Sequence, residues 1–161
     1  MPLNTTYSIG SDQAVAGMVA DSRVGFATVT RIPSANIAAG LLVTKDAAVG
    51  KAKLPSAATD YIIGATRWTP TMVQEDDGTA VYEAGRGAPV LTEGPVWLNA
   101  AEAIGEFDLV YGVISGAGKI GWVKKTQGAD TTTKPVGRAE TKTTASGELV
   151  VVHLRPALQN A

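Results

Sequence analysis

The sequence predicts a mainly β protein, built as a compact β-barrel or β-sandwich of many short strands with few short helices. Short apolar segments recur at roughly 8–12-residue intervals, each bounded by Gly or Pro. The 161 residues include 18 Gly and 8 Pro, and only 18% of them are charged, which is typical of a strand-and-turn chain with an apolar interior. Helical periodicity is confined to two short stretches, around 11–16 and 100–104. We therefore expect a single β domain over residues 14–161.

The first 13 residues predict an extended N-terminal arm, because they are polar and show no helical period. Residues 2–10 carry no charge, and their apolar members are candidate anchors for a partner: Leu3, Tyr7 and Ile9. An arm of this kind can add a strand to a neighbour's sheet edge or lie in a groove.

The strands of the first half are predicted from loose alternation over 14–31 and from two shorter segments. These are 36–43 (NIAAGLLV), which ends in a strand, and 60–66 (DYIIGAT), which Gly64 interrupts. The alternation places Val24 and Phe26 on one face of the first strand.

The stretch 67–78 (RWTPTMVQEDDG) predicts the longest loop, with Trp68 and Met72 as candidate partner-binding residues. Exposed apolar side chains in a loop often mark a partner surface, and the alternative is that Trp68 anchors the loop to its own domain. The acids 75–77 lack the spacing of a calcium loop and predict a solvated turn.

The second half predicts strands in the following segments: 80–85, 88–93, 94–100, 107–115, 119–125, 135–140 and 148–156. The polar stretch 127–135 (QGADTTTKP) is expected to be a loop. The last segment is the clearest strand, with Val150, Val152 and Leu154 on one face and His153 on the other.

The residue types argue against catalysis and against bound cofactors or metals. There is no Cys, and His153 is the only His, so neither a thiolate nor a multi-histidine metal site is available. No nucleophile motif accompanies His153, which we expect at the surface or in an interface. The stretch 116–121 (GAGKIG) matches a dinucleotide fingerprint, but a strand and a loop follow it where a helix is required, so it predicts a hairpin turn.

Charge and hydropathy exclude two classes of partner. Lys and Arg number 14 against 15 Asp and Glu, which is unlike a nucleic-acid-binding protein. No apolar run approaches the roughly 20 residues of a membrane span, and the N-terminus does not have the pattern of a secretory signal. Trp97 and Trp122 are expected in strands, as core or subunit contacts; a sugar-stacking platform formed with Trp68 is the alternative.

The two halves of the chain, 14–91 and 92–156, show an internal echo. Residues 37–43 (IAAGLLV) match 104–110 (IGEFDLV), and Gly64 within 63–65 matches Gly137 within 136–139. We predict two similar strand units packed with pseudo-symmetry; the alternative is that turn composition simply repeats itself. In either case the glycines serve a chain that reverses every few residues.

The order of these segments resembles the structural cement, or capsid decoration, proteins of tailed bacteriophages. The resemblance runs from about residue 14 to 156 and is carried by AGMVAD (16–21), IAAGLLV (37–43), YIIGA (61–65), PVLTEGPVWL (89–98), IGEFDLVY (104–111), VGRA (136–139) and GELVVV (147–152).

The resemblance implies a non-enzymatic virion protein on the outer surface of the capsid. Such proteins bind an HK97-fold major capsid protein as homodimers or homotrimers and clamp neighbouring capsomers after expansion. Three other readings remain open: a tail tube subunit, a head fibre base and a carbohydrate-binding β-sandwich module.

Overall fold

The computed structural model describes residues 14–21, 25–74 and 79–160. The predicted arm with Leu3, Tyr7 and Ile9 lies outside the described residues, and so do Val24 and the acids 75–77. The described chain is mainly β, as predicted, with twelve strands and one short 3-10 helix, η2 (Pro156–Gln159). No helix in the described ranges is long and apolar enough to span a membrane.

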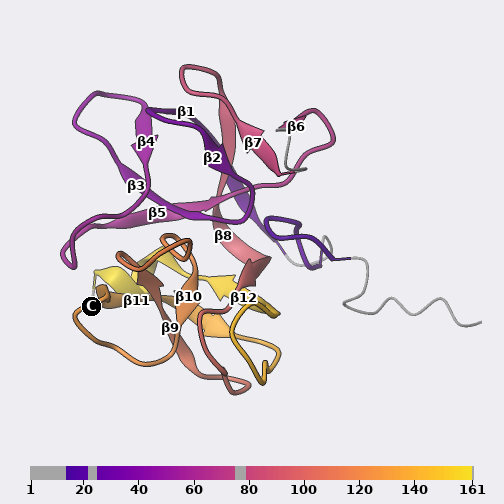
Figure 1. Cartoon of the computed structure of the whole chain (residues 1–161), viewed down its shortest axis with the longest axis vertical. Coiled ribbons are helices and arrows are strands. Elements are labelled where there is room, and N and C mark those ends of the chain that lie inside the picture. The colour runs from indigo at the N-terminus through magenta and orange to yellow at the C-terminus, as the bar shows by residue number, and fades with distance from the viewer. Residues whose placement is uncertain (1–13, 22–24, 75–78, 161) are drawn as a thin grey trace, which may run out of the picture.

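The first lobe is a closed ring of five strands, drawn above the second lobe in Figure 1. Its pairing order is β1–β4–β3–β5–β8 and back to β1; the β1–β4 contact is parallel and the other four are antiparallel. The strands are β1 (Ala27–Pro33), β3 (Leu42–Lys45), β4 (Lys51–Lys53), β5 (Ile62–Thr66) and the first half of β8 (Ala88–Asn99).

The second lobe closes in the same way, in the order β8–β12–β11–β9–β10 and back to the end of β8. A parallel bridge between Ala100 and Val123 makes the closing contact, and the other contacts are antiparallel. Its own strands are β9 (Leu109–Val113), β10 (Val123–Lys124), β11 (Thr131–Ala139) and β12 (Leu149–Leu154). Each lobe is thus a small barrel with one parallel and four antiparallel contacts.

β8 belongs to both lobes and changes partners at its middle. Glu93 pairs with Ala27 of β1, whereas the next residue, Gly94, pairs with Leu154 of β12. The segments 88–93 and 94–100 were predicted as two strands, and this was wrong, because Gly94 bends the strand without ending it. Gly94 has φ +115°, and a Cβ there would lie 2.6 Å from the Cβ of Phe26.

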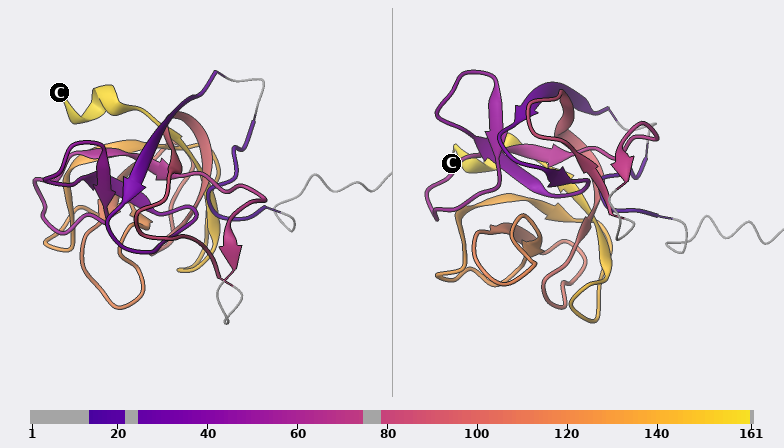
Figure 2. Two further views of the ribbon diagram at one scale, coloured as in Figure 1. Left: turned by 90° about the horizontal axis from the view of Figure 1, so that it is seen from above. Right: turned by 45° about the horizontal axis from the view of Figure 1, so that its top comes forward.

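Two further connections complete the fold. A small sheet in the order β2–β7–β6 flanks the first lobe. Its strands are β2 (Ile37–Ala38), β7 (Ala80–Tyr82) and β6 (Val73–Gln74). The segment 67–78, which was predicted to be a loop, therefore contains the short strand β6. The C-terminal turn η2 lies at the outside of the molecule (Figure 2). From η2, the Gln159 amide donates to the Ile62 carbonyl at 2.6 Å and accepts from the Ile62 N–H at 2.7 Å, which ties the C-terminus to β5.

The main hydrophobic core is continuous across both lobes, which explains why they stay together. It includes Leu42 and Ile62 from the first lobe and Val110 and Val136 from the second, all at most 2% exposed. Burial of this apolar surface is the dominant favourable term in folding. The predicted inner face of β12 is confirmed, since Val150, Val152 and Leu154 are at most 2% exposed, but the opposite face is not wholly at the surface, because Val151 is only 5% exposed.

Three predictions of local structure were wrong. The polar stretch 127–135 does not stay a loop, because β11 begins at Thr131 and buries the Thr131 and Thr132 side chains. The stretch 100–104 and the described part of 11–16 form turns and bends instead of helix. Only two residues of 119–125 are in a strand, so Trp122 sits in the turn just before β10, while Trp97 lies in β8 as predicted.

Candidate functional site

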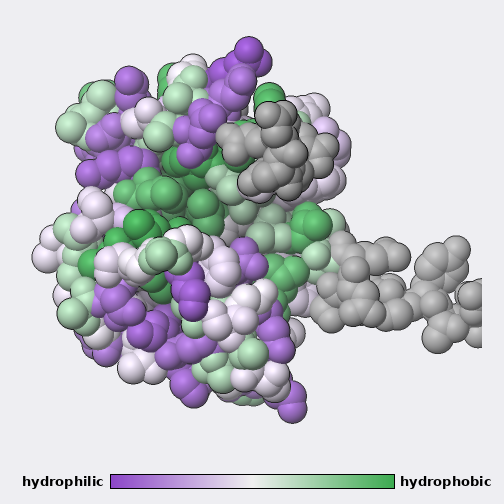
Figure 3. Space-filling model, in the orientation of Figure 1, coloured by the Kyte–Doolittle hydropathy of each residue, from purple (hydrophilic) through white to green (hydrophobic). Residues whose placement is uncertain are grey.

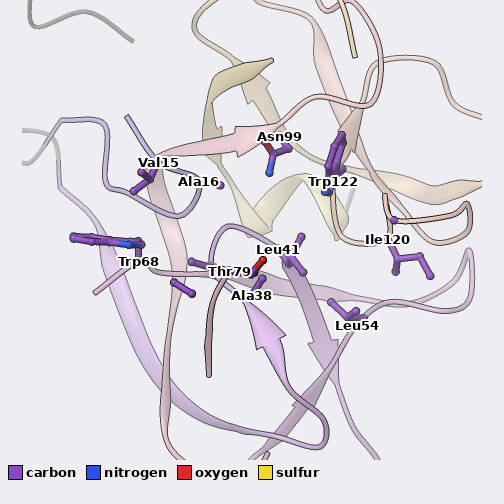
Figure 4. Close-up of a pocket in the computed structure, with 13 residues that line it drawn as sticks. Val15, Ala16, Ala38, Leu41, Leu54, Trp68, Thr79, Asn99, Ile120 and Trp122 are labelled. Carbon is purple, nitrogen blue, oxygen red and sulfur yellow. The ribbon is translucent and has the colours of Figure 1, made fainter. Parts of the chain in front are cut away.

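An apolar groove of about 820 Å³ lies between the two lobes. Figure 3 shows the hydrophobic surface exposed in this hollow, and Figure 4 shows Val15 and Trp68 at one end with Ile120 and Trp122 at the other. None of the described residues that line it is charged. The lining residues are Val15, Ala16, Ala38, Ala39, Leu41, Leu54, Trp68, Thr79, Ala80, Asn99, Gly118, Ile120 and Trp122.

Backbone contacts fix the Trp68 end of the groove. The Trp68 N–H donates to the Gly17 carbonyl at 2.8 Å, and the Tyr82 hydroxyl donates to the carbonyl of the preceding residue, Arg67, at 2.6 Å. Burial raises the pKa of the Tyr82 phenol, so it stays a neutral donor at physiological pH. The loop after β5 is therefore held to β7, and the half-buried Trp68 ring is presented from a fixed backbone.

The glycine-rich turn between β9 and β10 forms the Trp122 end. Gly121 N–H donates to the Val113 carbonyl at 2.9 Å, and Val113 N–H donates to the Trp122 carbonyl at 2.9 Å. The stretch 116–121 is a turn, as predicted, with Gly116, Gly118 and Gly121 all at positive φ and no helix after it. The segment 116–121 therefore does not form a dinucleotide-binding motif, because such a motif needs a helix N-terminus to hold the pyrophosphate.

The structure locates two of the five predicted partner-binding residues. Trp68 lines the groove, and Met72 is half-buried in the same loop without being part of the lining. Leu3, Tyr7 and Ile9 lie outside the described residues. The described chain begins next to the groove, because Val15 and Ala16 belong to its lining.

Sequence reasoning missed most of the groove. Leu41, Leu54 and Ile120 come from three separate segments outside the strands, and Ile120 joins the other two only because the two lobes pack together. Trp122 was expected in a strand as a core or subunit contact, yet it lines the groove. Its position directly after the 116–121 turn was the one local signal that it could be surface-accessible.

The titratable side chains form no catalytic cluster within the described ranges. His153 Nδ1 lies 3.0 Å from Glu140 Oε1, at a half-buried surface position on β12, and Arg138 of β11 is its cross-strand neighbour. No group of three or more acidic or histidine side chains in the described residues could hold a metal ion. The Glu102 carboxylate accepts the Thr126 N–H and the Asp108 carboxylate accepts the Gly105 N–H, each at 2.7 Å.

The described chain is thus a pair of β rings with an apolar groove between them. The family model "Structural cement protein (E217 gp24/Pam3 gp6)" matches residues 3–155, and the chain belongs to this family of bacteriophage capsid components. The protein is therefore a component of the virion, located on the capsid.

Solved structures resemble the chain in fold. A chain of "The capsid of Myoviridae Phage XM1" superposes with a TM-score of 0.72 at 20% identity, covering 95% of this chain and 97% of that one. The head fibre gp8.5 N base of bacteriophage phi29 reaches a TM-score of 0.46 at 15% identity, covering 82% of this chain and 96% of that one. No curated protein sequence matches the chain.

Proposed function

We propose that this protein binds the outside of the expanded major capsid shell, clamps neighbouring capsomers and so stabilises the head, without enzymatic activity. The observation that carries the proposal is membership of the structural cement family over residues 3–155. Its partners are an HK97-fold major capsid protein and further copies of itself, as a homodimer or homotrimer.

The groove between the lobes is the first proposed contact with the shell. The described part of its lining carries no charge and includes two tryptophans, Trp68 and Trp122. Buried Trp side chains are frequent energetic anchors of protein interfaces. An apolar segment of the shell protein that enters the groove would remove these rings from water. Met72, in the same loop as Trp68, extends this contact surface.

The N-terminal arm is the second proposed contact. Residues 2–10 carry no charge, and Leu3, Tyr7 and Ile9 would be its anchors on a neighbouring capsomer. An extended segment of this kind gains main-chain hydrogen bonds when it adds to a sheet edge. Two separate contacts from one small protein are the minimum that a clamp requires.

Mass action explains how such a clamp stabilises a shell. A ligand that binds only the assembled, expanded state shifts the equilibrium toward that state. Linking two contacts in one molecule makes the second binding event intramolecular, which raises the overall avidity without any new contact.

Co-sedimentation with capsid shells of its own phage tests the proposed function. We expect saturable pelleting at a fixed ratio to the major capsid protein with expanded, undecorated shells, and no pelleting with unexpanded shells. If the folded protein fails to pellet with expanded shells, the clamp proposal is wrong. Polymerisation of the purified protein would then favour a tail tube subunit, and binding on a glycan array would favour a carbohydrate-binding module.

Deletion of residues 2–10 tests the arm. The Gly17 N–H donates to the Trp97 carbonyl at 2.7 Å and the Trp97 N–H donates to the Met18 carbonyl at 3.0 Å, and both bonds remain in the truncated chain. We therefore expect an unchanged melting temperature and loss of pelleting. Unchanged pelleting by the truncated protein would remove the arm from the contact.

A further inference from the structure

The turn that leads into β9 holds an aromatic side chain in a strained and exposed position. Phe107 has φ +68°, in the left-handed region, and 64% of its surface is exposed. For a bulky residue without a local hydrogen-bonding side chain, a positive φ is a conformational outlier. Both the strain and the exposed ring disfavour this residue in the isolated chain, and retained strain of this kind is a pointer to function.

Hydrogen bonds on both sides of the turn hold Phe107 in place. Its N–H donates to the Ala139 carbonyl at 2.9 Å, and the Ala139 N–H donates to the Asp108 carbonyl at 2.9 Å. The Gly105 N–H donates to the Asp108 carboxylate at 2.7 Å, which closes the turn from its other end. The ring is thus presented from a backbone that is fixed before any partner arrives.

The corresponding turn of the first lobe contains glycine. Gly40 has φ +72°; its N–H donates to the Thr66 carbonyl at 2.8 Å, and the Thr66 N–H donates to the Leu41 carbonyl at 2.9 Å. This is the same reciprocal pair of bonds that Phe107 and Asp108 make with Ala139. The surroundings differ, because Gly40 is packed against Ala16, whereas the position of Phe107 is open.

The residue two places further on shows the same difference. Leu42 in the first lobe is 0% exposed, whereas Leu109 in the second is 37% exposed. The second lobe itself helps to cover Leu42, because a Cβ added at Gly112 of β9 would lie 3.1 Å from Leu42 Cδ1. Other parts of the chain therefore cover this surface in the first lobe, whereas the equivalent surface of the second lobe is exposed to solvent.

Phe107, Leu109 and Tyr111 form one surface, which we call the β9 face. It borders a shallow hollow of about 440 Å³ that Lys125 also lines. Leu109 and Tyr111 are two residues apart on β9 and so point to the same side of the sheet. The face is apolar at its centre and lies in the second lobe, apart from the groove.

Charges of both signs surround the β9 face. Lys125 and Asp108 line the hollow, Arg138 is the cross-strand neighbour of Leu109, and Glu106 directly precedes Phe107 in the chain. In the part of the chain that the structure describes, none of these four side chains forms an ion pair. A surface with balanced, unpaired charges around an apolar centre can complement a copy of itself, as an isologous interface requires.

We propose that the β9 face is the contact between two copies of this chain, related by a two-fold axis, with the two Phe107 rings packed near the axis. Each copy's cations then face the other copy's anions. Of the two oligomers named under the proposed function, this proposal favours the homodimer over the homotrimer. It can be tested without capsid shells. It can therefore be wrong while the proposed clamp function is right.

Sedimentation velocity of the full chain over a concentration series is the direct test. We expect a dimer for the wild-type protein and a rise of at least about tenfold in the dimer dissociation constant for Phe107→Asn, in line with loss of a central aromatic anchor. Asn tolerates the left-handed conformation, so the melting temperature of this variant should be equal to or above that of the wild type. With the melting temperature measured at a concentration where both proteins are monomeric, a fold defect would lower it and would also raise the dissociation constant.

Charge reversal tests the self-complementarity of the face. Glu106→Lys and Lys125→Glu should each weaken the dimer, because each leaves one sign in excess on both facing surfaces. The double variant restores the balance and should recover most of the lost affinity. Val49→Asn is the matched control, because Val49 is a 95% exposed apolar side chain in the first lobe, and this variant should dimerise like the wild type.

Several outcomes would overturn the proposal. These are a wild-type monomer or trimer, a Phe107→Asn protein that dimerises as tightly as the wild type, or a Val49→Asn protein that loses as much affinity as Phe107→Asn. If Phe107→Asn dimerises normally but no longer pellets with expanded shells, the β9 face contacts the shell and the two-fold contact is wrong.

Discussion

The two lobes have the same ring order and the same hydrogen-bonded turn, yet they use that turn in opposite ways. In the first lobe Gly40 lies under Ala16, and a Cβ at this position would come within 2.5 Å of the Ala16 carbonyl carbon. In the second lobe the corresponding Phe107 projects into open space. Both turns have the same backbone conformation. The difference between Gly40 and Phe107 therefore follows from what packs against each turn, and not from the conformation of the turn.

We propose that the lobes are two copies of one duplicated unit, as the echo between 14–91 and 92–156 predicts. Equivalent pairing supports this: Gly64 pairs with Val43 in the first lobe, and Gly137 pairs with Val110 in the second. A Cβ at either glycine would run into the backbone of the adjacent strand, at Leu91 or at His153. Both positions therefore require glycine for the same close approach.

Gly40→Ala should produce the largest loss of stability among the variants that compare a turn covered by the chain with a turn in open space. The added Cβ meets the backbone of Ala16, so we expect a loss of about 4 kcal/mol in the free energy of unfolding, measured by urea denaturation. Gly118→Ala is the matched control: its φ of +70° is nearly the same, but open space surrounds it, so only about 1 kcal/mol should be lost. Equal losses would mean that the N-terminal segment does not cover the first turn.

Leu42→Ala and Leu109→Ala compare the next pair of equivalent positions. Leu42 is fully buried in the shared core, and we expect about 3 kcal/mol of destabilisation from lost burial and the cavity left behind. Leu109 is exposed on the β9 face, so its truncation should cost the monomer less than about 1 kcal/mol. Denaturation at a concentration where the protein is monomeric measures both, and similar costs would contradict the difference in burial.

Thr66→Val tests a hydroxyl that only the first lobe has at this point. Thr66 Oγ1 donates to the Ala38 carbonyl at 2.7 Å and accepts the Leu41 N–H at 3.1 Å, whereas the equivalent residue of the second lobe is Ala139. We expect a loss of about 1–2 kcal/mol, because the variant leaves buried backbone groups without a partner. A thermal melt that matches the wild type would show that water or a backbone shift replaces the hydroxyl.

Asp130→Asn should give the smallest loss of stability of these variants. It tests the ion pair between Asp130 and Lys124, which lies in the second lobe. The hydrogen bond from Lys124, at 2.9 Å, is the main cause that lowers the pKa of Asp130 below 3.8. The carboxylate therefore stabilises the fold above pH 3.8, and this contribution disappears as the pH falls through the lowered folded-state pKa. We expect a loss under about 1 kcal/mol at pH 7, since the pair is partly exposed, and a smaller loss as the pH falls below 3.8. A loss that does not change with pH would point to packing instead of charge.

The strands with simple alternation could be predicted from the sequence. In β12 the face formed by Val150, Val152 and Leu154 is buried, and period two is sufficient to find that face, although Val151 on the opposite face is buried as well. β8 could not be predicted as one strand, because Gly94 followed by Pro95 is a local break signal. The fold overrides that signal by supplying pairing partners on both sides of it, Ala27 before and Leu154 after.

Composition misled the prediction for 127–135. Its threonines are polar, which suggests a loop, yet they are good strand formers and their hydroxyls find partners inside the fold. Thr132 Oγ1 accepts the Gly112 N–H at 3.1 Å and donates to the Lys134 carbonyl at 2.9 Å. The Gly112 partner comes from another strand, 20 residues away, and cannot be recognised from a window of neighbours.

The candidate site could be predicted only in part. Trp68 stands out as an apolar ring in a polar loop, but the groove it lines depends on how two lobes pack. The strain at Phe107 did leave a trace in the sequence, because the internal echo aligns it with Gly40. A bulky residue opposite a glycine in a repeated turn is a signal that could be sought in other duplicated chains.

β8 has a mechanical consequence for a protein located on a capsid. The strand runs through both rings without interruption, so tension between the two lobes along this axis passes through covalent bonds. Its flanking hydrogen bonds lie across that direction and share the load in shear, and several must break at once before the strand can slide. A joint of this kind resists pulling far better than two rings held only by their contact surface.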